Sequence, residues 1–263
     1  MEELENMILT MFHHEYSKVI VLRGSTSKQF LLYKKLIDAN DIDFDINKEL
    51  TDNLSEELEN YLNEVINQYN LKYNTNYFLS NNNREPIINK IEGYFTAKYY
   101  VKDPSIRKGN NEFIHFDIKL VLHSDTITIY SKDGINVIGD TIEKQIYPIL
   151  KILSNWTSKM GRIAKDIKSL YDFISNCDDN GIDAGKLVAL MKNDFYPRGK
   201  YDSFVKGRDK IKILFKATYN KFSDKEIDTI LKLVNEFVKP LMQFEGENYT
   251  KWYKDKHWVK KPH

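Results

Sequence analysis

The chain has 263 residues, of which 41% are hydrophobic and 13% aromatic, so it can bury a full core as one large domain or two moderate ones. Its single cysteine, Cys177, excludes an internal disulfide and a cysteine-based zinc cluster. No apolar run approaches the roughly 18 residues needed to span a membrane, and the N-terminus is acidic where a secretory signal is basic, which predicts a cytoplasmic protein with no membrane partner.

The net charge of +1 conceals an uneven distribution of charge along the chain. Residues 1–70 carry 6 Lys/Arg against 14 Asp/Glu, whereas residues 196–263 carry 16 against 9. This pattern is expected if the first part holds a metal ion and the last part approaches a polyanion, although solvated faces produce similar patterns.

The first part of the chain alternates helical and β-rich segments. Residues 2–14 are predicted to form a helix, and "KVIVLRG" (18–24) is predicted to form a strand that ends in glycine. "STSKQFLLYKKLIDA" (25–39) begins with Ser and Thr and has apolar residues at helical spacing, which predicts a helix with a capped N-terminus. An amphipathic helix is predicted over 54–70.

Three segments rich in β-branched and aromatic residues follow, at 91–101, 112–122 and 126–132. Turn signals separate them, so they are predicted to form a meander. If the first two strands form a hairpin, Asp117 lies opposite about residue 98.

From about residue 140 the pattern is helical to the end. The predicted helices lie near 141–176, 183–193, 203–219, 224–244 and 247–258. The expected fold class is therefore α+β, with a mixed sheet and flanking helices over 1–138 and an all-helical C-terminal domain over 139–263. The tail "YTKWYKDKHWVKKPH" (249–263) is equally typical of a nucleic-acid contact and of a terminal helix that docks Trp252 and Trp258 on the core.

The acidic stretch "NDIDFDINK" (40–48) carries the main functional signal. Asp41, Asp43 and Asp45 alternate with apolar residues, so an extended chain places three carboxylates on one face. Repulsion and desolvation disfavour such a row unless a cation lies against it, and a divalent metal ion is the usual candidate. A solvated edge strand is one alternative. A calcium-binding EF-hand is another, but Ile46 occupies its glycine position.

The segment before this row has the features of a phosphate site. Gly24, at the end of a strand, lets the backbone approach a phosphate closely. The hydroxyls and amides of Ser25 and Thr26, at the start of the next helix, can hold that phosphate. Lys28 lies one helical turn further on and adds a positive charge.

A third carboxylate completes the predicted metal site. Asp117, in "HFDIK", lies in an alternating strand and faces away from the apolar set, so it can join Asp41 and Asp43 in a two-metal site. "FDIK" also fits a metal-dependent nuclease with Asp103 as the upstream acid. That interpretation is disfavoured, because the hairpin register leaves Asp103 about 16 Å away at strand rise.

These motifs, in this order, resemble the nucleotidyltransferase superfamily that includes DNA polymerase beta. "VLRGSTSKQFLLY" followed by "NDIDFDI" is similar, more narrowly, to the AbiEii/AbiGii abortive-infection toxins. "QIYPILKIL" is similar to that family's lysine segment, here with Lys151, and "RIAKDIKSLYDF" is similar to its Arg-x-x-Lys-Asp-x-x-Asp helix. The last motif has two registers, of which we favour the one with Asp166 over the one with Asp172.

The resemblance implies a bacterial toxin of a toxin–antitoxin or phage-defence system. Its implied reaction transfers a nucleoside monophosphate from an NTP to an RNA acceptor, with a tRNA 3′ end as the expected acceptor and a separately encoded antitoxin as protein partner. Two Mg²⁺ ions, or Mn²⁺ in their place, are the implied cofactors. A non-catalytic binding protein with the same scaffold and an enzyme that modifies a small molecule remain alternatives.

The resemblance also assigns roles to residues of this chain. The implied catalytic residues are Asp41, Asp43, Asp117, Lys151 and Asp166. The first three of these are the implied metal ligands. The implied nucleotide-binding residues are Gly24, Ser25, Thr26, Lys28, Arg162 and Lys165.

Overall fold

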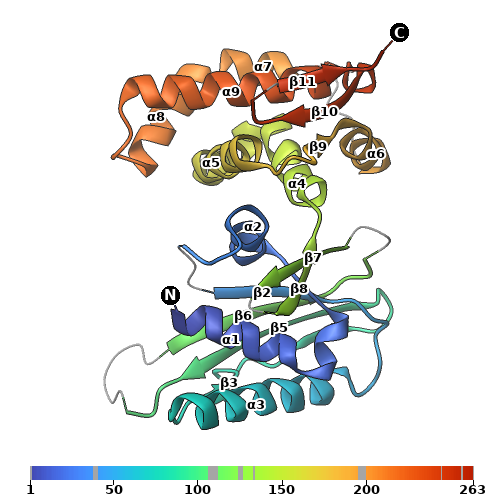
Figure 1. Ribbon diagram of the computed structural model, residues 1–263, viewed down its shortest axis with the longest axis vertical. Helices are drawn as coiled ribbons and strands as arrows, with labels where there is room; N and C mark the ends of the chain where they lie inside the picture. Colours follow the sequence, from blue (N-terminus) through green and yellow to red (C-terminus); the bar gives the residue numbers. More distant parts are fainter. Residues whose placement is uncertain are drawn as a thin grey trace. The chain divides into compact units, whose positions relative to one another are not determined.

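The computed structural model describes residues 2–37, 41–105, 112–123, 127–132, 134–194, 200–243, 245–255 and 257–262. The chain divides into two compact units, Met1–Thr141 and Ile142–His263, which are drawn in Figure 1 and described separately. The predicted α+β class is confirmed, because the chain combines a mixed sheet with helices. None of the helices in the described part combines the length and the apolar character needed to cross a bilayer.

The first unit is a mixed sheet with flanking helices. Its helices are α1 (Glu2–His13), η1 (Glu15–Val19), α2 (Gly24–Tyr33) and α3 (Leu54–Tyr73). Its strands are β1 (Ile20–Leu22), β2 (Asp41–Ile46), β3 (Phe78–Ser80), β4 (Ile87–Asn89), β5 (Tyr94–Lys102), β6 (Glu112–Leu120), β7 (Ile127–Lys132) and β8 (Ile135–Asp140). The strand order is β3-β5-β6-β2-β1-β8-β7, and β4 also pairs with β5.

The strand pairing brings the predicted metal-binding segments together at the centre of this sheet. Strand β2 is parallel to β6, and Asp43 lies opposite Asp117. On its other side β2 is antiparallel to β1. The alternative of a solvated edge strand for the acidic row is therefore wrong, and so is the calcium loop, because Asp41–Ile46 is a strand between two others.

The predicted meander is wrong in its last step. Strands β5 and β6 do form the antiparallel hairpin, but β7 pairs with β8 instead of β6. Both edges of β6 are already occupied, one by β5 and the other by β2. Turn signals show where a strand ends, but they do not show which strand becomes its neighbour.

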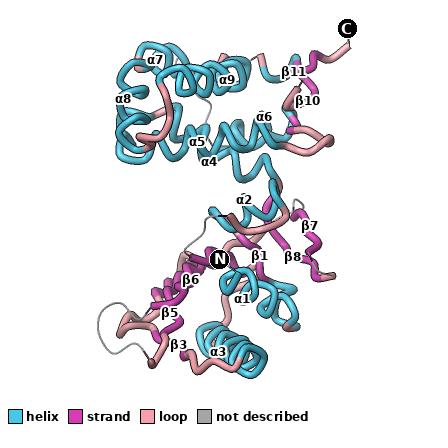
Figure 2. The backbone as a smooth tube through the Cα atoms, turned by 60° about the vertical axis from the view of Figure 1, so that its left-hand side comes forward, coloured by secondary structure: helices cyan, strands magenta, loops and turns pink. Residues whose placement is uncertain are grey.

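The two faces of β2 have different surroundings. Ile42, Phe44 and Ile46 are fully buried in one apolar cluster with residues of α1 and α3. Figures 1 and 2 show these two helices on one side of the sheet and α2 on the other. The carboxylates of β2 therefore point to the side of α2, as the alternation of apolar and acidic residues requires.

Helix α2 is shorter than the segment predicted for it. The helix begins at Gly24 and ends at Tyr33, because Lys34 adopts a left-handed conformation with φ of 57°. Its N-cap is Arg23, without a side-chain capping bond, where a Ser or Thr cap was expected.

The second unit is mainly helical. Its helices are α4 (Ile142–Ser154), η2 (Trp156–Lys159), α5 (Met160–Asn176), α6 (Ala184–Asp194), α7 (Lys200–Lys206), α8 (Arg208–Thr218), α9 (Asp224–Met242) and η3 (Gly246–Asn248). Strands β9 (Ile182–Asp183), β10 (Tyr249–Tyr253) and β11 (His257–Lys260) form a small sheet in the order β11-β10-β9. The expectation of an all-helical second domain missed this sheet. The units divide after Thr141, so the predicted boundary between residues 138 and 139 falls inside β8.

The predicted helix at 247–258 is wrong, because β10 and β11 form an antiparallel hairpin. In the structure both indole rings of this tail pack against the second unit, as one of the two alternatives expected, but from a hairpin and not from a helix. Trp252 is fully buried and its Nε1 donates to the carbonyl of Ile174, 2.9 Å away. Trp258 stacks on Phe237 at 5.0 Å between ring centroids and donates to the carbonyl of the same residue.

Candidate active site

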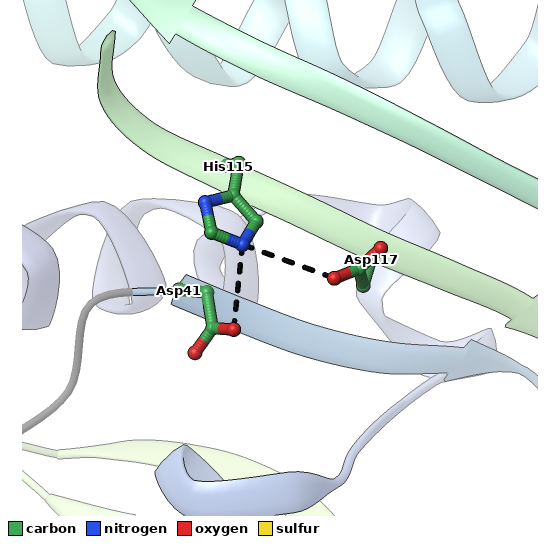
Figure 3. Close-up of side chains that lie close together, drawn as sticks. All are labelled: Asp41, His115 and Asp117. Atoms are coloured by element: carbon green, nitrogen blue, oxygen red, sulfur yellow. Dashed lines mark ion pairs between the residues drawn. The ribbon is translucent and has the colours of Figure 1, made fainter.

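Two carboxylates and an imidazole converge on the face of β2 and β6 opposite the apolar core. Asp41 lies opposite His115 in the parallel register, and Asp117 is two positions further along β6. Nε2 of His115 is 3.4 Å from Oδ2 of Asp41 and 3.8 Å from Oδ2 of Asp117. Dashed lines in Figure 3 mark these two ion pairs. The three potential ligand atoms all lie within 4.8 Å of one another.

The composition of this group, Asp41, His115 and Asp117, suits a divalent cation. Carboxylate oxygen and imidazole nitrogen are both common ligands of divalent metal ions in proteins. The three side chains are 31%, 27% and 38% exposed, so an ion and an incoming ligand could both reach them. Three protein ligands would leave further coordination positions open, as catalytic metal sites require.

Asp43 lies beside this group but turns toward the start of α2. Gly24 has a φ of +66°, and a Cβ atom there would be 2.2 Å from Oδ2 of Asp43. Nη2 of Arg23 is 3.8 Å from Oδ1 of Asp43 and donates to the carbonyl of Asp117 at 3.1 Å. Burial raises the pKa of the Asp43 carboxyl, Arg23 opposes this rise, and the neighbouring carboxylates of Asp41 and Asp117 add to it.

The third carboxylate of the row belongs to a different set of charges. Oδ1 of Asp45 is 2.9 Å from Nε of Arg23, and Oδ2 is 3.1 Å from Nε2 of His123. Nδ1 of His123 is 3.0 Å from Oδ1 of Asp140, and only 4% of the His123 side chain is exposed. Burial alone would lower the pKa of His123, but its bonds to Asp140 and Asp45 outweigh burial and raise that pKa to about 9.

Asp45, His123 and Asp140 also have the composition of a metal site. However, Arg23 and a positively charged His123 already neutralise this group. The aspartates of this row therefore have different charged partners. Protein cations balance Asp45, whereas Asp41 belongs to the more exposed group with His115.

Lys98 of β5 provides a further cation next to the group of Asp41, His115 and Asp117. It lies opposite Asp117 in the β5–β6 hairpin, which confirms the predicted pairing of residues 98 and 117. Its Nζ is 3.3 Å from Oδ2 of Asp117. Asp103, the acid required by the nuclease alternative, is partly exposed beyond the end of β5 and accepts hydrogen bonds from Ser105.

The predicted phosphate-binding residues lie at the start of α2. Gly24 and Ser25 are exposed there, and Lys28 is partly exposed one turn later. Thr26 is fully buried, and its hydroxyl donates to the carbonyl of Arg23 at 3.1 Å. The Thr26 side chain therefore stabilises the helix start, and only the other three residues offer accessible groups.

The remaining predicted residues belong to the second unit. Lys151 is exposed in the last turn of α4, and Lys165 is exposed on α5. Arg162 donates to both carboxylate oxygens of Asp166, at 2.9 and 3.1 Å.

The alternative register of this motif has a similar ion pair. Nζ of Lys168 is 2.5 Å from Oδ1 of Asp172. Asp166 and Asp172 are both buried and paired within α5, so pairing and burial do not distinguish the two registers.

Sequence reasoning missed Arg23, His115 and Lys98. His115 shares the strand face of Asp117 because it lies two positions away, and this spacing was available in "HFD". The hairpin register also pointed to Lys98. Arg23 immediately precedes Gly24, but nothing in the sequence showed that its side chain would reach two aspartates of the next strand.

No protein-family model and no curated protein matches the chain. Among solved structures, the crystal structure of JHP933 from Helicobacter pylori is similar over 94% of this chain and 93% of that chain, with 12% identity and a TM-score of 0.45. A similarity at this level establishes neither a shared fold nor a shared function.

Proposed function

We propose that this protein is a metal-dependent nucleotidyltransferase that transfers a nucleoside monophosphate from an NTP to an RNA acceptor. One observation carries the proposal. The parallel pairing of β2 and β6 gathers Asp41, Asp43 and Asp117 on one face, beside a helix that starts at Gly24. Carboxylates beside a helix N-terminus are the groups that a metal-bound triphosphate requires, which supports the proposal.

The first unit supplies groups for each part of such a substrate. Asp41, Asp43 and Asp117 would hold divalent cations, which when bound neutralise triphosphate charge and lower the pKa of the acceptor hydroxyl. The backbone at Gly24 and Ser25 would bind terminal phosphate oxygens, because the first amides of a helix have no partner within it.

The proposed chemistry needs positioning more than covalent participation by the protein. The acceptor oxygen forms a bond to the α-phosphorus, the bond to the pyrophosphate oxygen breaks, and the hydroxyl proton is released to water. Arg23 would hold Asp43 and the backbone of Asp117 in place, because it contacts both. Fixed charges around an in-line displacement account for much of the catalysis in such reactions.

RNA is the acceptor class that the charge of the second unit favours. Lys206, Arg208, Lys210 and Lys212 lie on α7 and α8. Arg208 and Lys212 are close to Asp228, at 3.7 and 2.7 Å. Lys206 and Lys210 are exposed and have no ion pair with another described residue. These two lysines are therefore the better candidates for phosphate contacts.

The assignment as a toxin, with a tRNA 3′ end as acceptor and an antitoxin as partner, rests on the family resemblance. Lys151, Arg162, Lys165 and Asp166 have their proposed nucleotide-related roles on the same basis.

The test is to incubate the purified protein with each α-labelled NTP, Mg²⁺ or Mn²⁺, and total RNA. We expect label in RNA of tRNA size with the wild type and none with Asp43→Asn. Asp103→Asn is the matched control, since it removes a partly exposed carboxylate outside the site, and it should retain transfer.

Each other outcome identifies a specific error. Label in small molecules alone would favour the alternative of a small-molecule enzyme. Absence of label with every NTP, in protein that still binds NTP, would favour a non-catalytic binding protein. If the wild type cleaves RNA and Asp103→Asn does not, the nuclease interpretation would be restored.

A further inference from the structure

We infer that His115 is a direct ligand of the catalytic metal ion, and that the site consequently prefers a first-row transition metal, such as Mn²⁺, to Mg²⁺. The inference deepens the proposed function, since it concerns the same site. It differs from the set predicted from the sequence, in which three carboxylates hold the metal. The compact group in the structure contains His115 where Asp43 was expected.

The distances from Nε2 of His115 to the two carboxylates fit ligands that share one ion. Ligands about 2.1 Å from a metal are roughly 3.0 Å apart at right angles, 3.4 Å apart at tetrahedral angles and 4.2 Å apart when opposite. Nε2 of His115 is 3.4 Å from the Asp41 oxygen and 3.8 Å from the Asp117 oxygen. Both values fall within this range.

The same distances do not fit a hydrogen-bonded ion pair. Hydrogen bonds from a nitrogen donor to an oxygen acceptor are typically 2.7–3.2 Å long. His123 lies closer to its own two aspartates, at 3.0 and 3.1 Å. His123 is therefore held by hydrogen bonds to its two acids, whereas His115 stands farther from Asp41 and Asp117.

The strands prevent His115 from turning away from this group. Its neighbours Ile114 and Phe116 are buried in the core, so strand alternation fixes the imidazole on the carboxylate side. Its ring also lies next to Tyr100, with 6.1 Å between the ring centroids. A positioned ligand loses less entropy when it binds a metal than a mobile one.

Donor chemistry gives the expected preference for the metal. Magnesium favours oxygen ligands and retains its water, whereas imidazole suits transition metals. Replacing one oxygen ligand with His115 should therefore weaken Mg²⁺ more than Mn²⁺. Lys98, 3.3 Å from the Asp117 oxygen, must give way to either ion, so it does not discriminate between them.

The experiment uses Mn²⁺ alone with the full chain and detects the nitrogen of the bound imidazole by pulsed electron paramagnetic resonance. We expect a ¹⁴N coupling in the wild type that disappears in His115→Gln, with Mn²⁺ affinity reduced about tenfold and Mg²⁺ affinity reduced less. His14→Gln, which changes a histidine paired with Glu64 elsewhere in the unit, should retain the coupling. His115→Asp supplies a third oxygen and should shift the preference toward Mg²⁺.

The inference is overturned if the wild type shows no nitrogen coupling with Mn²⁺ bound, if the coupling persists in His115→Gln, or if the wild type binds no Mn²⁺ at millimolar concentration. Nucleotide transfer without the coupling would contradict the role of His115 and leave the proposed function standing. A nitrogen coupling without transfer of any nucleotide would support the role of His115 as a metal ligand and contradict the proposed function.

Discussion

Gly24→Ala tests how closely the start of α2 fits against the acidic strand. A residue other than glycine at a φ of +66° costs about 1–2 kcal/mol. In addition, the new Cβ atom would lie 2.2 Å from Oδ2 of Asp43, whereas ordinary contacts begin at 3.4 Å. The carboxylate must therefore move by about 1.2 Å, and a misplacement of this size can reduce a reaction rate by roughly 100-fold.

Gly93→Ala is a control that separates the two effects. Gly93 has a φ of +61° but no atom within 4 Å of the position of a Cβ, so its substitution carries the conformational cost without a clash. Both variants should lose about 1–2 kcal/mol of unfolding free energy in urea titrations. Only Gly24→Ala should bind Mn²⁺ more weakly, by about tenfold, when free Mn²⁺ is followed by paramagnetic resonance.

Two results would refute this reasoning. If Gly24→Ala binds Mn²⁺ within twofold of the wild type, Asp43 is not constrained by the helix start or does not contribute to the site. If Gly93→Ala weakens metal binding equally, the effect is a general loss of stability.

Three further predictions concern charged side chains. Asp43→Asn should raise the unfolding free energy of the metal-free protein at pH 7, because burial raises the pKa of this carboxyl above its ordinary value of 3.8. This gain in stability should disappear as the pH falls below 3.8, and a gain that stays constant with pH in urea unfolding would contradict the prediction. The pKa of His123 is raised from its ordinary value of 6.5 to about 9. The wild type should therefore lose about 3 kcal/mol of unfolding free energy as the pH rises from 6.5 to 9, and His123→Gln should not show this loss. Replacing Lys206 and Lys210 with Gln should reduce the slope of log K for RNA binding against log salt by about 1.4, which is about 0.7 for each lysine. Lys212→Gln, which breaks the 2.7 Å pair with Asp228, should change this slope by much less than about 0.7; a change of about 0.7 in that variant would exclude a specific role for Lys206 and Lys210.

Alternation along single strands was the part of the site that the sequence specified best. Asp41, Asp43 and Asp45 share one face of β2, and the apolar residues between them fill the core, because side chains of a strand alternate whatever its neighbours are. The same rule placed Asp117 opposite the apolar face of β6.

Local sequence patterns could not predict the parallel pairing of β2 with β6. Helix α3 and strands β3 to β5 separate the two strands along the chain, and any of several strands could satisfy the same alternation. The metal-binding role that we propose for His115 could be inferred only after this register placed it opposite Asp41. The terminal hairpin shows a similar limit, since Trp252 and Trp258 suit the core in either conformation.

The position of β8 has a consequence for how the protein is made. Strand β1 has two neighbours, and β8, which pairs with it in parallel, ends only at Asp140. A nascent chain therefore exposes one edge of β1 until the whole first unit has left the ribosome, and unpaired edges are sites of misassembly. Asp41 and Asp43 are synthesised well before Asp117 joins them, so an incomplete chain carries only part of the proposed metal site. If the protein has the proposed activity, assembly of the site late in synthesis would keep unfinished copies inactive.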